Sequence, residues 1–262
     1  MFRKPSPLNV AVAIGTVTLK EIVRDRILYN AVLAAGVLLA VSYLASQLIF
    51  MQPERVVMDF GLSAMNLSCS FIAILIGAVL VSREFERRTI FVILSKPLTR
   101  FEFLIGKYAG LTALLAANWT ILGAAFLAIL IGTGGAVNAT LVWGLVFVLL
   151  QSLVLGAIAI LVSSFSTTSI SVICSIGLYL IGNNISEIRF VANRTTTEIG
   201  RFFLESVAIL LPNFEHFNLG SKVPYGFPVP FFDIGIKTLV YAIVWILLTL
   251  VVSGFVIHRR EI

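Results

Sequence analysis

Residues 140–165 read TLVWGLVFVLLQSLVLGAIAILVSSF, an apolar run without any charged side chain. At about 1.5 Å per residue, a helix of roughly 20 residues crosses the hydrocarbon layer of a bilayer, so this run is long enough to span a membrane. The whole chain has 262 residues, is 59% hydrophobic and has a mean hydropathy of +1.02. A soluble domain could not bury that much apolar surface, so the sequence predicts an integral membrane protein.

Other apolar runs of comparable length extend this pattern along the chain. The six candidate spans predict an all-α membrane protein and cover approximately 27–49, 60–82, 103–131, 140–165, 168–186 and 234–257. We read residues 1–262 as one transmembrane domain. No short apolar core with a small-residue cleavage site precedes the first span, so we expect no cleaved signal peptide.

The basic side chains indicate how these spans are oriented. Lysine and arginine are enriched in cytoplasmic loops near the ends of spans. With both termini inside, most of the 19 basic residues fall on the cytoplasmic side, and acidic residues balance the remainder outside. We therefore expect a multi-pass protein of the cell (inner) membrane with cytoplasmic termini. The net charge of +6 then reflects topology and gives no reason to expect a nucleic-acid partner.

The densest charge cluster, REFERRTIFVILSKPLTR at residues 83–100, falls between the second and third spans. Good helix formers with apolar residues on one face, followed by Pro97, predict a short cytoplasmic helix over 83–98. Thr99 and Glu102 have the spacing of a capping box that starts the third span. The short helix could be only a positively charged anchor. Its acidic and aromatic residues favour a docking element for a soluble partner.

One extended motif overlaps this cluster. It consists of Glu84, Glu86, Thr89, Ile90, Leu94, Ser95, Lys96, Pro97, Leu98, Thr99, Arg100, Phe103, Leu104, Gly106, Lys107 and Tyr108. This run resembles the cytoplasmic loop of permease subunits of type-2 ATP-binding-cassette (ABC-2) exporters. The layout of the rest of the chain is similar to that family too, with weaker support from PNFEHFNL at 212–219.

The resemblance implies that 83–98 is a coupling helix seated on a separate cytoplasmic ATPase. The residues implied in that contact are Glu84, Glu86, Arg87, Arg88, Thr89, Ile90 and Leu94. It also implies a second permease chain, identical or related, that completes the pathway. The sequence has no G-x-x-x-x-G-K-[ST] motif, so we expect ATP and Mg²⁺ to bind the partner ATPase and this chain to be a transport subunit, not an enzyme.

Two segments outside the spans have amphipathic patterns. Residues 7–26 predict a helix in the membrane interface, although an ordinary basic flank to the first span is the alternative. The external segment 187–233 contains a second T-x-x-E spacing at Thr195 and Glu198, followed by apolar residues at helical intervals. Because this segment is too apolar for a solvated loop, we expect it to dip into the outer leaflet; a small cap packed on itself is the alternative.

Polar stripes within the spans are candidates for a translocation pathway. One stripe in the second span and one in the fifth have helical spacing; they consist of Asp59, Ser63, Asn66 and Ser70, and of Ser171, Ser175, Tyr179 and Asn183. The candidate pathway residues among them are Ser63, Asn66, Ser70, Ser175, Tyr179 and Asn183. Both stripes could equally be seams of helix packing. The third span has a stripe of alanines that we expect to pack against another helix, at Ala109, Ala113, Ala117 and Ala125.

Other classes of function have less support in the sequence. The chain has two cysteines and two histidines and no H-E-x-x-H motif, so we expect no metal site, and His216 is interpreted as structural. A secondary transporter would need an ionisable residue near the middle of a span, and the predicted spans contain none. A membrane-embedded enzyme acting on lipid is the other alternative. The sequence does not identify the cargo.

Overall fold

The computed structural model describes residues 7–23, 26–47, 53–86, 99–195, 197–219 and 234–259. These residues form nine α-helices and one 3-10 helix, η1, and contain no β-strand, which confirms the predicted all-α class for this part of the chain. The helices are α1 (Pro7–Val23), α2 (Arg26–Gln47), α3 (Pro53–Glu86), α5 (Arg100–Gly132), α6 (Ala139–Ser163), α7 (Thr168–Gly182), α8 (Ile185–Arg194), α9 (Glu198–Leu210), η1 (Phe214–Phe217) and α10 (Ile236–Arg259).

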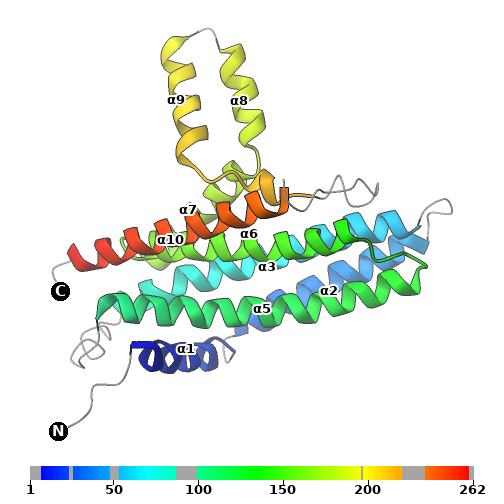
Figure 1. The fold of residues 1–262 in the computed structure, drawn as a ribbon, viewed down its shortest axis with the longest axis horizontal. Coiled ribbons are helices and arrows are strands. Elements are labelled where there is room, and N and C mark those ends of the chain that lie inside the picture. Colours follow the sequence, from blue (N-terminus) through cyan, green and yellow to red (C-terminus); the bar gives the residue numbers. More distant parts are fainter. Residues whose placement is uncertain are drawn as a thin grey trace.

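A bundle of long helices forms the body of the molecule (Figure 1). Helix α3 packs against α2, α5, α6 and α7, and α10 packs against α6. The buried core lies mainly on α3 and α6, where Met65, Ile72, Leu155 and Ile160 are fully enclosed. These two helices therefore place the side chains of the bundle interior, and the other long helices surround them.

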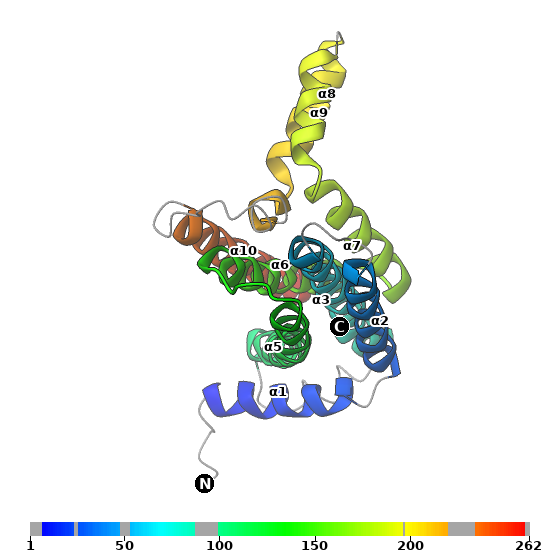
Figure 2. The ribbon, with the colours of Figure 1, turned by 90° about the vertical axis from the view of Figure 1, so that its right-hand side faces the viewer.

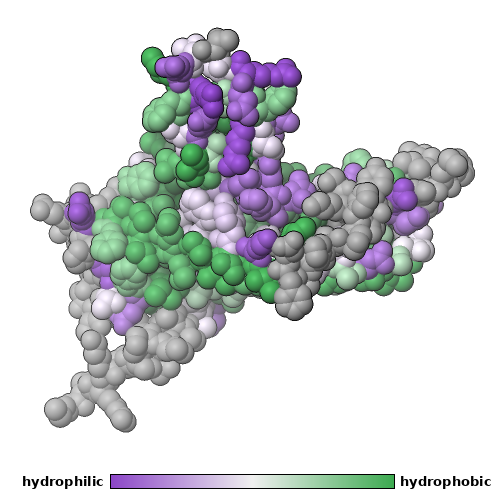
Figure 3. All heavy atoms as spheres, turned by 45° about the horizontal axis from the view of Figure 1, so that its top comes forward, coloured by the Kyte–Doolittle hydropathy of each residue, from purple (hydrophilic) through white to green (hydrophobic). Residues whose placement is uncertain are grey.

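The outer faces of the bundle are hydrophobic. Helix α10 exposes Ile243, Val244, Leu247 and Phe255, and Figure 3 shows the corresponding continuous apolar surface below the projecting hairpin. Large exposed apolar side chains in such numbers are unfavourable in water and favourable in lipid. The distribution is that of an integral membrane protein.

Four helical stretches in the described part are long and apolar enough to cross a membrane, namely residues 54–84, 100–132, 139–163 and 236–257. The pair α7–α8 would make a fifth, broken by a bend of 68°. The predicted first span, 27–49, corresponds to α2, whose apolar stretch Val32–Ala45 is shorter. Six spans therefore stay a prediction.

Two helix boundaries differ from those that the sequence predicted. Helix α3 continues through Glu86, so no break precedes Arg83, because the chain from Val81 to Glu86 lacks a proline or glycine that would end it. The predicted fifth span, 168–186, is interrupted at Asn183 and Asn184, and α8 starts at Ile185. The alanines of the stripe on α5 are exposed, and Ala109 lies beside α1, where a Cβ on Gly15 would be 3.7 Å from its Cβ.

Helix α1 lies across α5, as the view along the bundle in Figure 2 shows. The two helices approach closely at small residues: a Cβ on Gly110 would lie 2.8 Å from Cβ of Thr18, and one on Gly15 would lie 3.3 Å from the carbonyl oxygen of Gly106. Side chains longer than hydrogen would separate the backbones. Ile22 is buried and Lys20 is exposed, as the amphipathic pattern of 7–26 predicted.

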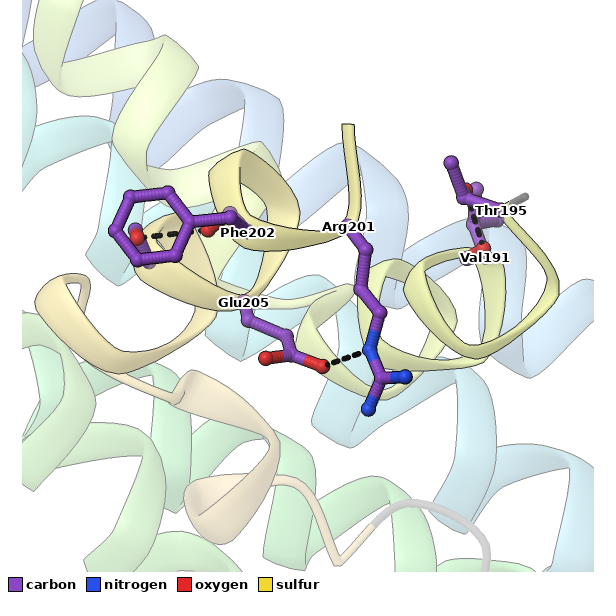
Figure 4. Close-up of polar contacts among 6 residues, drawn as sticks. Val191, Thr195, Arg201, Phe202 and Glu205 are labelled. Atoms are coloured by element: carbon purple, nitrogen blue, oxygen red, sulfur yellow. Dashed lines mark hydrogen bonds and ion pairs between the residues drawn. The ribbon is translucent and has the colours of Figure 1, made fainter. Parts of the chain in front are cut away.

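Helices α8 and α9 pack against each other as a hairpin that projects from the bundle on the side away from α1 (Figure 2). Large apolar side chains of α9 point outward, with exposed fractions of 80% for Ile199 and 74% for Phe202. Polar contacts within the helices of the hairpin include the ion pair of 2.7 Å between Arg201 Nε and Glu205 Oε1 (Figure 4). The hairpin is thus amphipathic along its length.

The predicted capping box at the start of α9 is wrong. Thr197 is the N-cap and makes no side-chain cap, whereas the Thr195 hydroxyl donates to the carbonyl oxygen of Val191 at 2.8 Å and so belongs to the end of α8. A threonine can bond back to its own helix as easily as forward to the next one, which the spacing alone does not reveal. The box at Thr99 and Glu102 is confirmed, with both reciprocal hydrogen bonds present.

Candidate functional site

The polar stripes of α3 and α7 meet at a pocket of about 380 Å³. Four of the six predicted pathway residues line it: Ser63 and Asn66 from α3, Tyr179 from α7 and Asn183 at the end of α7. The remaining walls come from α3, α6 and the segment around η1, namely Leu62, Leu67, Gly144, Val148, Phe217, Asn218 and Leu219. Residues distant in sequence are thereby brought together around one cavity.

The other two predicted residues lie behind the pocket. Ser70 is fully buried; its hydroxyl donates to Oδ1 of Asn66 at 3.3 Å, and its side chain is also hydrogen-bonded to Tyr179. Ser175 is fully buried one turn before Tyr179, and its hydroxyl has no hydrogen-bond partner among the described residues. Ser70 therefore bridges Asn66 and Tyr179 of the pocket lining and joins α3 to α7 behind the cavity.

Sequence reasoning missed Gln151, which α6 contributes to the same polar region. Its side chain is fully buried, and its Nε2 donates to Oδ1 of Asn183 at 3.3 Å. Its Oε1 is buried with no hydrogen-bond partner among the described residues. A buried amide that is only half satisfied is costly and usually has a functional reason. The available signal was the amide itself, since Gln151 interrupts the apolar run 140–165, which has no charged side chain.

Aromatic side chains fix the wall of the pocket on the side of η1. Phe217 contacts Phe147 of α6 and Tyr241 of α10, and Phe214 contacts Tyr179, with ring centroids between 6.1 and 6.5 Å apart. The backbone N–H of Asn213 donates to the Tyr241 hydroxyl at 2.7 Å. The segment PNFEHFNL is therefore an anchor that holds one pocket wall against two helices.

The close approach of α7 to this anchor requires a glycine. A Cβ on Gly182 would lie 2.4 Å from Cδ2 of Phe214 and 2.7 Å from the carbonyl oxygen of Pro212. Glu215 then links η1 to the first turn of α8, because its Oε1 accepts from the backbone N–H of Ser186 at 2.8 Å and from the Ser186 hydroxyl. His216 stacks edge-on against Tyr241 at 5.4 Å. The bend between α7 and α8 is held by these contacts.

A second group of polar residues gathers at the other end of α3. Nζ of Lys107, on α5, lies 3.0 Å from Oε1 of Glu84 on α3 and 3.7 Å from Oε2 of Glu21 on α1. The Lys107 side chain is only 6% exposed, compared with 15% for Glu84 and 61% for Glu21. Glu84 was predicted to contact an ATPase, and the structure gives its carboxylate an internal partner.

The other predicted ATPase contacts cannot be placed. The side chain of Glu86 and all of Arg87, Arg88, Thr89, Ile90 and Leu94 lie outside the described residues. Their role as a docking surface stays a prediction. The structure does place the start of that segment, because α3 leads directly into it from Glu84.

Comparison with known proteins agrees with this architecture. A family model described as "ABC-2 family transporter protein" matches residues 18–261, which is nearly the whole chain. No curated protein matches the chain. The matched region includes the membrane-spanning candidates, the pocket and the ion cluster at Lys107. The chain therefore belongs to the ABC-2 transporter family and is a transmembrane permease of that family.

Proposed function

We propose that this chain is the membrane subunit of an ATP-driven exporter. In this proposal two permease chains, identical or related, form the translocation pathway, and a separate cytoplasmic ATPase binds ATP and Mg²⁺ and performs the hydrolysis. The observation that carries the proposal is the convergence of the α3 and α7 stripes on one pocket, at Ser63, Asn66, Tyr179 and Asn183. One chain supplies one wall of the route, and a second chain supplies the other.

The chemistry of the pocket limits the group that the route accepts. Amide and hydroxyl groups supply its polar lining, and none of the described residues around it carries a charge at neutral pH. An ion taken from water into such a site without a counter-charge would lose several kcal/mol of solvation. A hydroxyl or amide group can instead bond to Asn66 or Asn183. We therefore expect the cargo to present an uncharged polar group here.

The same chemistry weighs against the alternative of a self-contained ion-coupled carrier. A carrier of that kind needs a titratable or charged side chain at its binding site. The buried side chain of Lys107 pairs with Glu84, at the end of α3 that lies far from the pocket. No specific observation favours a lipid-acting enzyme.

In the proposed orientation, the Lys107 end of the bundle faces the cytoplasm, and both termini lie on the cytoplasmic side of the cell membrane. The direction of α1, which runs across the bundle in Figure 2, suits a helix in the inner interface when the bundle axis follows the membrane normal. The α8–α9 hairpin also runs across that axis, on the opposite side of the bundle from α1 and at a similar level along its length in Figure 1, so its exposed apolar side chains would face lipid.

Purification of the tagged chain from its native membrane in a mild detergent tests the proposal. We expect an ATPase subunit to co-purify in a stoichiometric ratio and to hydrolyse ATP. Reversing the charges of Glu86 and Arg87 together should release that subunit or uncouple its activity. Reversing the pair Arg201 and Glu205, which lies on the hairpin, is the matched control and should leave the complex intact. A chain that purifies alone, without ATPase activity, in several mild detergents would contradict the proposal.

A further inference from the structure

The ion cluster at Lys107 joins three helices that are distant in sequence. Lys107 belongs to the second turn of α5, Glu84 to the last turn of α3 and Glu21 to the last turn of α1. Both carboxylates lie within 4 Å of the same ammonium nitrogen. The Lys107 ammonium also lies 5.8 Å from the ring centroid of Phe103. One side chain therefore connects the helix that leads into residues 87–98 with two others.

Burial makes these connections strong. Lys107 is almost completely enclosed, so its charge depends on protein carboxylates in place of water. Glu84 is the principal partner because it is closer and better buried than Glu21. Removing one member of such a pair is far more costly than replacing both with uncharged groups of similar size. The position of Glu84 relative to α5 is consequently fixed by charge as well as by packing.

Neighbouring helices connect the ion cluster at Lys107 to the pocket. The approach of α1 to α5 at Gly15 and Gly110 holds Glu21 beside Lys107. A cavity of about 30 Å³, lined by Ile22, Leu75, Arg83 and other residues, leaves space next to the ion pair. Helix α3 is continuous from Glu84 to the pocket residue Ser63, a length of about 30 Å at 1.5 Å per residue. A displacement of the Glu84 end of α3 should therefore also displace the end that carries Ser63.

We propose that Lys107 is a positioning residue that converts movement of residues 83–98 into movement of the pocket wall. The Lys107–Glu84 pair makes α3 and α5 move together at this end of the bundle, and Glu21 makes α1 follow. Glu84 thus acts through Lys107 and not by contact with the ATPase. This inference rests on the proposed function, because it supposes that an ATPase acts on residues 83–98.

The decisive variant is the uncharged pair Glu84→Gln with Lys107→Met. It removes both charges and keeps the side-chain volumes, so the protein should fold whether the cluster is structural or transmits movement. If Lys107 positions the pocket wall, this variant should hydrolyse ATP but lose the ATP-dependent movement of that wall. The charge exchange Glu84→Lys with Lys107→Glu should restore part of that response. Lys20→Met, at an exposed position on α1, is the control.

The response can be measured without knowing the cargo. Nitroxide labels are attached at Phe71→Cys on α3 and Leu180→Cys on α7, both exposed and outside the pocket lining, in a Cys174→Ser background. The complex with its ATPase is reconstituted in lipid nanodiscs, and the distance between labels is measured by pulsed electron paramagnetic resonance, with and without ATP, Mg²⁺ and vanadate. We expect the wild-type protein and Lys20→Met to change distance on vanadate trapping.

The two proposals fail in different ways in this experiment. A folded uncharged-pair variant whose label distance changes as in the wild type would overturn the role of Lys107 and leave the exporter proposal standing. No co-purifying ATPase, or no vanadate-dependent change in the wild type, would instead overturn the exporter proposal and with it this inference. Loss of ATP hydrolysis in the uncharged-pair variant would also count against it, because Lys107 is assigned to transmission and not to ATPase binding.

Discussion

At the scale of single residues, the polar groups behind the pocket are the least expected feature of the permease. Gln151 lies buried on the largely apolar helix α6, and among the described residues only its Nε2 has a hydrogen-bond partner, Oδ1 of Asn183. An unsatisfied buried acceptor costs on the order of 1–3 kcal/mol. Residues that lower stability in this way beside a route are expected where a passing polar group, or water, completes the hydrogen bonds.

Gln151→Leu is therefore expected to separate stability from transport. The substitution keeps the volume and removes the unsatisfied Oε1, so the temperature of thermal unfolding in detergent should stay unchanged or rise. Asn183 loses its donor, so cargo-stimulated ATPase activity should fall by roughly tenfold, the equivalent of about 1.4 kcal/mol.

Ser152→Ala is the control for Gln151→Leu, because the Ser152 hydroxyl bonds only within its own helix, to the carbonyl oxygen of Leu149. That substitution should leave both the unfolding temperature and the activity unaltered. A fall in unfolding temperature for Gln151→Leu, as large as that caused by a core cavity, would show that Gln151 is structural.

At the scale of elements, the contact between α7 and the η1 anchor decides the shape of the pocket. The contact exists because the last residue of α7 is Gly182, against which Phe214 packs directly. The anchor is completed by Tyr241, which accepts the hydrogen bond from Asn213. The position of Phe217 and Asn218 in the pocket wall therefore depends on residues of two helices that do not themselves line it.

Gly182→Ala should displace this anchor. The added methyl group overlaps Phe214 and the backbone of Pro212, and overpacking of this kind costs typically 1–3 kcal/mol. The unfolding temperature measured by differential scanning fluorimetry should fall.

Gly177→Ala is a matched control on the same helix, since nothing lies within 4 Å of its position. Alanine is there expected to stabilise α7 by up to about 1 kcal/mol through helix propensity. Equal effects at both glycines would mean that the contact with Phe214 does not constrain α7.

At the scale of the whole molecule, two structures lie across the bundle axis, α1 on one side and the α8–α9 hairpin on the other (Figure 2). The hairpin has hydrophilic side chains gathered on one surface in Figure 3, and the exposed apolar side chains of α9 include Phe202, Phe203 and Leu210. The hydrogen bond that Arg201 donates to Glu205 raises the pKa of the Arg201 guanidinium, which stays charged at neutral pH. Such a division suits a helix pair lying in the membrane interface.

A nitroxide at Phe202→Cys should therefore contact lipid, and one at Arg201→Cys should contact water. Electron paramagnetic resonance with oxygen, which concentrates in lipid, and a water-soluble nickel complex measures both contacts in nanodiscs. The background should carry Cys174→Ser, because Cys174 is exposed whereas Cys69 is buried. Equal access of the nickel complex to both labels would place the hairpin in water and favour a cap packed on itself.

The sequence by itself determined the class of the protein and most of its helices. Long apolar runs force helices in a membrane, because every backbone polar group must find a partner within its own segment. The capping box at Thr99 was readable for a similar reason, since both of its hydrogen bonds lie within four residues. The stripes of α3 and α7 were also readable, because helical spacing places their members on one face.

Only the tertiary structure decided which of those faces meet. The alanine stripe of α5 had the composition of a packing seam, yet it is exposed, while glycines of the same helix receive α1. The sequence predicted Glu84 as a surface charge, whereas the structure pairs it with the buried side chain of Lys107, 23 residues away. Spacing records which side chains share a face of one helix, whereas burial and ion pairing depend on neighbours that fold back from elsewhere in the chain.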